Sequence, residues 1–126
     1  ELARLKGIKT KALVSEFPDI ITDLMQVFDK TVLAKQVPVC VFEGNEAIIN
    51  TSGNPGLATA GTGDVLAGMI SGFLSQGHSN LNAATLSAFI HGKASDIIAS
   101  EKGYRGQIAS DLLAKVPDVI KEYERA

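Results

Sequence analysis

Hydrophobic residues follow two different rhythms along the 126-residue chain. In the second half they recur every three or four positions, which is the spacing of one buried helix face. This spacing predicts a helix from Val65 to a stop at Gly77 and another helix over 83–100. A third helix is predicted to begin at Ile108. We expect Pro117 to break it before a short amphipathic end, because proline has no amide hydrogen to donate.

The first half mixes helical and extended patterns. Residues 1–7 have the pattern of a helix end, with Gly7 as the stop. Helical spacing after Pro18 predicts a longer helix that runs to about Gln36. Its apolar stripe is formed by Ile20, Ile21, Leu24, Val27, Phe28 and Val32.

Two short strands are predicted next. The run from Val37 to Phe42 is apolar and rich in β-branched residues, which is typical of a strand. Because no polar residue alternates within it, we expect burial on both faces, as in parallel sheets. The second strand is predicted over Glu46–Asn50, with Gly44 and Asn45 forming the turn before it.

Two strands against four or five helices make an unbalanced set of elements. So small a sheet does not cover the apolar faces of that many helices in a complete α/β domain. The chain also begins at Glu1 rather than at methionine. We therefore expect an α/β fold of which residues 1–126 form the C-terminal part. A helical domain with a single hairpin is the alternative.

Composition and charge exclude several classes of function. With 45% hydrophobic and 21% charged residues, the chain is globular rather than disordered. A formal net charge of −2 argues against binding to nucleic acid or to an anionic membrane. The single cysteine, Cys40, indicates a reducing compartment, so a cytoplasmic protein is expected. His78 and His91 have no third ligand at metal-binding spacing, and His91 fits a packing role within its apolar helix better than a catalytic one.

Candidate chemistry concentrates in Gly61-Thr62-Gly63-Asp64, which opens the first helix of the second half. The two glycines let the backbone approach a ligand closely, because no Cβ stands in the way. Amides in the first turn of a helix are unpaired and carry partial positive charge. Gly61, Thr62 and Gly63 are therefore candidates for an anion hole that receives a phosphoryl group. Asp64, at the rim of this hole, is the candidate catalytic base for a hydroxyl.

A purely structural explanation of the same four residues stays open at this point. Threonine is a common N-cap, so Thr62 would cap the helix. An aspartate in the first turn, as at position 64, stabilises the helix dipole without any substrate. The segment also lacks the spacing of a Walker A loop and of the GxGxxG dinucleotide motif.

A longer stretch favours the functional explanation. Residues 53–68 read GNPGLATAGTGDVLAG and closely resemble the signature of the ADP/ATP-dependent NAD(P)H-hydrate dehydratases, a family with a ribokinase-like fold. The resemblance continues through 73–77, 91–94 and 108–112. Residues 1–5 resemble the tail of the family's Pro-His-Pro-Gly-Glu segment.

This resemblance implies a fold, an activity and a set of site residues. The fold is a ribokinase-like α/β sandwich. The activity is the repair of hydrated NADH or NADPH: ADP or ATP phosphorylates the hydroxyl on the hydrated nicotinamide ring, and phosphate then leaves. Asp64 matches the residue that contacts the hydrated cofactor and acts as the base. Gly63, Gly44 and Asn54 match contacts to the adenine nucleotide, whose phosphates Mg²⁺ accompanies.

One position departs from the family pattern. The family has a lysine where this match places Glu43, within Phe42-Glu43-Gly44. A carboxylate close to phosphate is unfavourable by about 1 kcal/mol or more even at a water-like dielectric. Either nucleotide affinity is reduced, or the strand aligns with the family in a different register.

The family domain is also about twice as long as this chain. Its substrate-contacting histidine segment has no counterpart here, so we expect no turnover by this chain alone. We also expect either a homo-oligomer or association with the N-terminal part of the domain.

Two further functions stay open. A kinase of a small alcohol, from the same superfamily, would use the same Asp64 and the same amides. A truncated module without catalysis would bind only a nucleotide or a partner subunit.

Overall fold

The computed structural model describes most of the chain, namely residues 3–4, 7, 9, 16–27 and 29–124. The helix end predicted over 1–7 lies largely outside this set, as does Phe28 of the predicted stripe.

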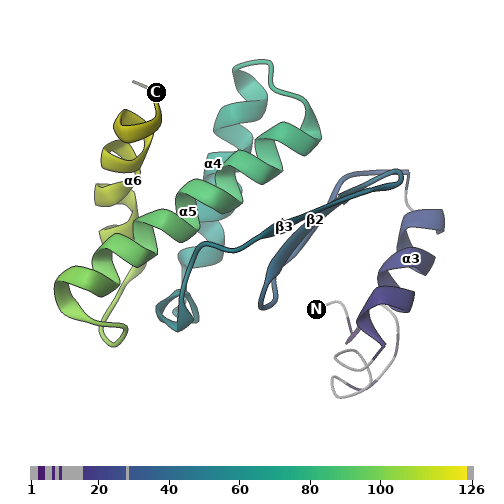
Figure 1. Ribbon diagram of the computed structural model, residues 1–126, viewed down its shortest axis with the longest axis horizontal. Helices are drawn as coiled ribbons and strands as arrows, with labels where there is room; N and C mark the ends of the chain where they lie inside the picture. The colour runs from purple at the N-terminus through teal and green to yellow at the C-terminus, as the bar shows by residue number, and fades with distance from the viewer. Residues whose placement is uncertain (1–2, 5–6, 8, 10–15, 28, 125–126) are drawn as a thin grey trace.

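A three-stranded antiparallel sheet runs through the middle of the described part (Figure 1). Its strands are β1 (Val32–Ala34), β2 (Val39–Glu43) and β3 (Glu46–Asn50), and they are hydrogen-bonded in that order. The predicted hairpin is confirmed, since β3 has the predicted bounds and pairs with β2 in antiparallel register. Gly44 lies in its tight turn with a φ of +55°, a conformation that favours glycine.

The prediction of a parallel strand over Val37–Phe42 is wrong in direction and in its bounds. The strand is β2, two residues later at its start, and both of its neighbours are antiparallel. The apolar run without polar alternation has another cause: helices cover both faces of β2. Phe42 packs toward the N-terminal helix, whereas Val41, only 1% exposed, faces the opposite side.

The helix predicted from Pro18 to Gln36 is also too long. Helix α3 spans Phe17–Val27, and the chain then enters β1, which was not predicted. Val32, predicted in the helical stripe, instead pairs with Phe42 across the sheet. Pairing of this β-branched segment with β2 overrides a helical spacing that continued only by coincidence.

Helix α3 covers one face of the sheet. Ile20 and Ile21 form a small buried cluster with Ala34 of β1, and the Phe17 ring lies 6.3 Å from that of Phe42. An open apolar groove of about 760 Å³ remains between α3 and the strands, and Ile49 of β3 lines it.

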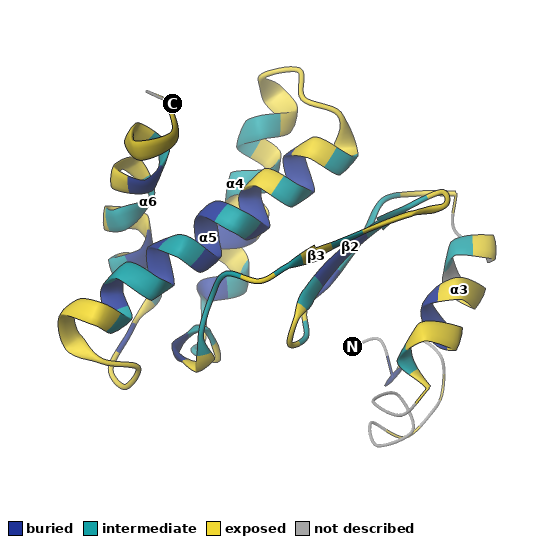
Figure 2. Cartoon of the chain, viewed as in Figure 1, coloured by how far each residue is buried: buried dark blue, intermediate teal, exposed yellow. Residues whose placement is uncertain are grey.

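Three helices lie on the opposite face. They are α4 (Thr62–Ser75), α5 (Asn80–Lys102) and α6 (Ala109–Tyr123), and α5 is the one that packs on β2 and β3. Helix α5 crosses between the other two and carries the largest share of buried positions (Figure 2). The main core, between the three helices, consists of Val65, Ile90, Ala94, Ile98, Leu112 and Val119.

Pro117 does not break α6, contrary to the prediction, and the helix continues to Tyr123. Pro117 lies on the exposed side, as does Leu113, whose carbonyl would have been its hydrogen-bond acceptor. Water can therefore satisfy that carbonyl. Val119 is fully buried beyond the proline, so core packing keeps the last turns helical.

None of the helices in this described part is both long enough and apolar enough to cross a membrane.

Candidate phosphate-binding site

The segment before α4 is folded so that a glycine is the N-cap of the helix. Gly61 is the N-cap, with φ +86° and ψ −15° in the left-handed region, and it has no capping side chain. A residue with a side chain is strained in this conformation. A Cβ at this position would also lie 3.1 Å from the Cβ of Ala109, at the start of α6. Glycine is required at position 61 for both reasons.

Thr62 is not the N-cap that the structural explanation expected. It is the first helical residue and is only 6% exposed. Its single hydroxyl proton is shared between the carbonyls of Leu57 (2.8 Å) and Thr59 (2.9 Å). Thr62 therefore fixes the start of α4 to the preceding 3₁₀ turn, Pro55–Leu57, and leaves the cap position without a side-chain acceptor.

The backbone amides at this helix start are mostly free. Within the described residues, the amides of Gly61 and Gly63 have no acceptor. The Thr62 amide makes one long bond of 3.4 Å to the Thr59 carbonyl, and the Asp64 amide donates to the Gly61 carbonyl at 3.1 Å. The predicted anion hole thus has two unbonded donors and one weakly bonded donor, at the positive end of a 14-residue helix.

Asp64 extends from the first turn of α4 into solvent. It is exposed, and its carboxylate has no hydrogen bond or ion pair with any described residue. A carboxylate held inside the protein would contradict a role as base, but this one is accessible. It is placed on the same helix turn as the free amides.

A cation that the sequence analysis missed lies beside the amides. Lys35 follows β1 directly, and a Cβ built on Gly63 would lie 3.5 Å from its Nζ. An ammonium group near Gly63 adds positive charge to the partial charge of the helix. The signal was available, since Lys35 ends an apolar β-branched run, but that run had been assigned to a helix.

Glu43 is the last residue of β2, directly before the turn at Gly44. Its carboxylate accepts a hydrogen bond from the Thr31 hydroxyl. In the β1–β2 register Ala34 pairs with Cys40 and Val32 with Phe42, so Glu43 lies at the end of β2 away from Lys35. Lys35 rather than Glu43 is the charged side chain that these two strands place near Gly63.

Gly44 is not brought to the amides either. It forms the β2–β3 turn, at the same end of β2 as Glu43, and it lines the groove against α3. The structure thus joins Gly61, Thr62, Gly63 and Asp64 in one place, but it sets Gly44 apart from them.

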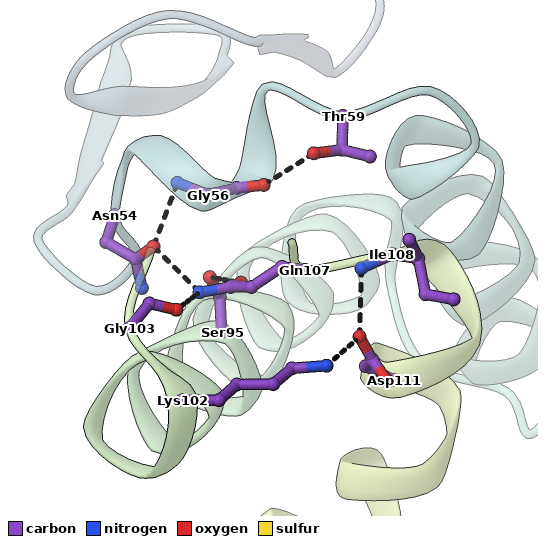
Figure 3. Close-up of polar contacts among 9 residues, drawn as sticks. All are labelled: Asn54, Gly56, Thr59, Ser95, Lys102, Gly103, Gln107, Ile108 and Asp111. Atoms are coloured by element: carbon purple, nitrogen blue, oxygen red, sulfur yellow. Dashed lines mark hydrogen bonds and ion pairs between the residues drawn. The ribbon is translucent and has the colours of Figure 1, made fainter. Parts of the chain in front are cut away.

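Asn54 lies near the helix start, but its side chain is used inside the protein. Its Oδ1 accepts hydrogen bonds from the Gly56 amide (3.0 Å) and from Gln107 Nε2 (3.4 Å), as Figure 3 shows. Its Nδ2 donates to Asp96 at 3.0 Å. Its oxygen is thus engaged within the protein, and the second N–H of Nδ2 is what remains for the predicted nucleotide contact.

His91 reaches the same segment from α5. It is buried, and its Nε2 lies 2.9 Å from the Thr62 carbonyl, which requires Nε2 to carry the proton. Burial lowers the pKa of His91 below its ordinary value of 6.5, an effect that the Thr62 carbonyl opposes. The predicted packing role fits this neutral, hydrogen-bonded ring.

Phosphate chemistry with Mg²⁺ is compatible with these residues. Among the described residues, no three His, Cys, Asp or Glu side chains form a group able to hold a metal ion. Mg²⁺ is often held by substrate phosphates and water with only one or two carboxylates. The residues therefore fit an ion that arrives with a nucleotide, and Asp64 is the free carboxylate beside the amides.

Comparison with known proteins assigns the chain to a family. The model of the NAD(P)H-hydrate dehydratase family matches residues 1–118. The chain belongs to this family.

Two relatives illustrate how similar the chain is to other members of the family. A bifunctional NAD(P)H-hydrate repair enzyme of Moorella thermoacetica is 37% identical over 98% of this chain and 24% of its own length. The ADP-dependent (S)-NAD(P)H-hydrate dehydratase of Neisseria meningitidis serogroup B is 38% identical over 90% of this chain and 38% of its own.

Two solved structures show the same fold. The ADP/ATP-dependent NAD(P)H-hydrate dehydratase of Bacillus subtilis, co-crystallised with ATP and Mg²⁺, matches 95% of this chain and 44% of its own with a TM-score of 0.89 and 23% identity. A ribokinase-like superfamily protein of Enterococcus faecalis matches 82% of this chain and 36% of its own, with a TM-score of 0.67 and 29% identity. The predicted ribokinase-like α/β fold is confirmed. The chain spans less than half of each of these relatives.

The free amides predict a specific sensitivity at Gly63. In Gly63→Val the branched side chain enters the space between the amides and Lys35 Nζ, 3.5 Å from the first added carbon. We expect ADP and ATP binding, measured by titration calorimetry, to weaken about ten-fold or more, because hydrogen bonds to a charged ligand are lost. Gly68→Val, on the same helix with nothing within 4 Å, is the matched control. Equal weakening in both variants would show that helix stability, not access to the amides, controls binding.

The buried His91 predicts a pH dependence of stability. Its folded-state pKa is lowered, so the unfolded chain takes up the proton first as the pH falls below about 6.5. Stability from this residue is therefore fully present above that pH and is lost as the pH decreases toward the lower folded-state pKa. In urea unfolding at pH 7.5 and 5.5, His91→Gln should lose less stability than the parent on acidification. His78→Gln, at an exposed position, should behave as the parent does. If His91→Gln loses as much free energy of unfolding as the parent between pH 7.5 and 5.5, His91 is not the source of the pH dependence.

Proposed function

We propose that this chain supplies the phosphate-binding and base-carrying part of a nucleotide-dependent dehydratase for hydrated NADH and NADPH. One observation carries this proposal: free amides at Gly61 and Gly63, the Lys35 ammonium group and the exposed Asp64 carboxylate lie at one helix start. The dehydratase family of the chain supplies the substrate class. Adenine nucleotides and reduced nicotinamide cofactors are abundant in the cytoplasm, so we place the activity there.

The reaction needs a base for the hydroxyl proton and donors that stabilise the negative charge on the transferred phosphoryl group. The Asp64 carboxylate takes the proton of the hydroxyl on the hydrated ring as the oxygen attacks the terminal phosphorus of the nucleotide. The bond between that phosphorus and the nucleotide's bridging oxygen breaks, and the amides with Lys35 stabilise the charge on the transferred group. Phosphate then leaves the ring carbon with the electrons of the C–O bond, a ring proton is lost, and the dihydronicotinamide is restored. Mg²⁺, when bound, neutralises the nucleotide phosphates.

Turnover on this proposal also needs the part of the ribokinase-like domain that this chain does not match. The solved dehydratase is covered over only 44% of its chain, so more than half of that structure lies outside the match. We infer that the remaining part, whether from the same polypeptide or from an associated one, completes the site for the hydrated cofactor.

A substitution of Asp64 tests the base. Asp64→Asn keeps the shape but cannot accept the proton, so in the assembled enzyme turnover should fall by about 10²–10⁴-fold. Nucleotide binding should be largely retained, because the amides are unchanged. The assay follows phosphate release together with recovery of the absorbance of the reduced nicotinamide. Asp118→Asn, an exposed carboxylate on α6, is the control.

Two results would overturn this proposal. Full activity in Asp64→Asn would exclude it as the base. A stable phosphorylated alcohol as the only product, with no free phosphate, would indicate a small-alcohol kinase instead.

A further inference from the structure

Helix α5 holds the segment between β3 and α4 at several points along its length. Asn50 Nδ2 donates to the Ala88 carbonyl (3.2 Å), and the Ser52 hydroxyl donates to the Phe89 carbonyl (3.0 Å). The His91 ring contacts the far end of the segment. Between these neutral contacts, a charged side chain of α5, a carboxylate, also binds the segment.

That carboxylate belongs to Asp96, and each of its two oxygens has its own donor. Oδ2 accepts from the Gly53 amide and Oδ1 from Asn54 Nδ2, both at 3.0 Å. Gly53 has a φ of +104°, so its peptide is turned into a conformation that favours glycine. Asp96 therefore fixes both a peptide group and the adjacent side chain. Charge-assisted bonds of this kind are among the stronger hydrogen bonds in proteins.

The Asn54 amide continues the network inward. With Nδ2 directed to Asp96, its Oδ1 is directed to the Gly56 amide and to Gln107, a side chain that is only 3% exposed (Figure 3). Gln107 is itself oriented by the Ser95 hydroxyl, which donates to its Oε1 at 2.9 Å. A Cβ on Gly56 would lie 2.5 Å from the Gln107 side chain, so the loop is packed tightly against it.

From Gly56 the same path reaches α4. The Thr59 hydroxyl donates to the Gly56 carbonyl at 3.0 Å. The carbonyls of Leu57 and Thr59 in turn accept from the Thr62 hydroxyl. A continuous series of hydrogen bonds thus joins Asp96 to the residue between the two glycines with free amides.

We propose that Asp96 is a positioning residue: it orients Asn54, and through Asn54 it holds the loop that presents the Gly61 and Gly63 amides to phosphate. The proposal rests on the proposed function of those amides. The essential element is the orientation of the Asn54 side-chain amide, with its NH₂ group toward Asp96 and its oxygen toward Gly56. An acceptor on α5 secures the orientation in which the Asn54 amide group points to α5 and its carbonyl accepts from Gly56 and Gln107.

Exchange of hydrogen-bond polarity gives a direct test. In Asp96→Asn, the new amide presents a donor to Gly53 or to Asn54, both of which are donors, so one bond is lost. In Asn54→Asp, two carboxylates face each other. The double variant, Asp96→Asn with Asn54→Asp, restores a donor opposite an acceptor and keeps an oxygen directed to Gly56.

Two readouts are measured on the full chain: ADP–Mg²⁺ affinity by calorimetry, and hydrogen exchange of the Gly56 amide, which Asp96 does not touch. Each single variant should bind ADP about ten-fold more weakly and should exchange the Gly56 amide at least about ten-fold faster. The double variant should recover most of both. Ser79→Ala is the control for general destabilisation, since it removes the cap of the same helix far from the loop. It should lower the melting temperature without changing either readout.

The outcomes are separable. Unchanged affinity and unchanged Gly56 exchange in Asp96→Asn would overturn the proposal, as would a double variant no better than the worse single one. If the parent chain does not bind ADP, the proposed nucleotide site fails, and Gly56 exchange in the same variants then decides the role of Asp96 alone. Faster exchange that is reversed in the double variant supports it, and unchanged exchange refutes it.

Discussion

The site depends on one physical constraint: a few backbone amides must stay unbonded while the loop that carries them is held by other hydrogen bonds. Unpaired donors attract whatever acceptor is near, including the protein's own carbonyls, and a relaxed loop would close on itself. Here the surrounding groups are satisfied by side chains. The Thr62 hydroxyl donates to the carbonyls of Leu57 and Thr59. His91 Nε2 donates to the Thr62 carbonyl, and Asn54 Oδ1 accepts from the Gly56 amide. These carbonyls already have other donors, and the amides of Gly61 and Gly63 have no acceptor among the described residues.

This arrangement explains why α5 is the most buried helix although it bears no residue of the proposed chemistry. One side of it forms the core with α4 and α6, through Ile90, Ala94 and Ile98. Its polar side chains and two of its backbone carbonyls hold the loop instead. A rigid helix is a better support for such contacts than another loop, because its positions are fixed by core packing.

Local patterns in the sequence predicted much of this structure. The helices of the second half, the β2–β3 hairpin and the Gly-Thr-Gly-Asp segment all depend on residues close in sequence, where spacing and turn chemistry decide the conformation. Pro117 was misjudged because core packing of Val119 outweighs the loss of one exposed hydrogen bond. The β1 strand was missed because its apolar residues happen to continue the period of α3.

Contacts between distant residues could not be predicted from these patterns. Lys35 and Gly63 are 28 positions apart, and their approach depends on the register of a strand that had been assigned to a helix. Asn54 and Asp96 are 42 positions apart, and Asn54 was assigned to the nucleotide rather than to the protein. Asp64 needed no such contact, since its position follows from the helix start alone.

The most direct measurement is a titration of the ¹⁵N-labelled chain with ADP and Mg²⁺, followed by the NMR signals of individual backbone amides. Saturable shifts concentrated at Gly61 and Gly63, reproduced at the same two amides by inorganic phosphate, are what this account predicts. Shifts that leave both glycines unmoved while other amides respond, or no saturable response at any amide, would contradict it.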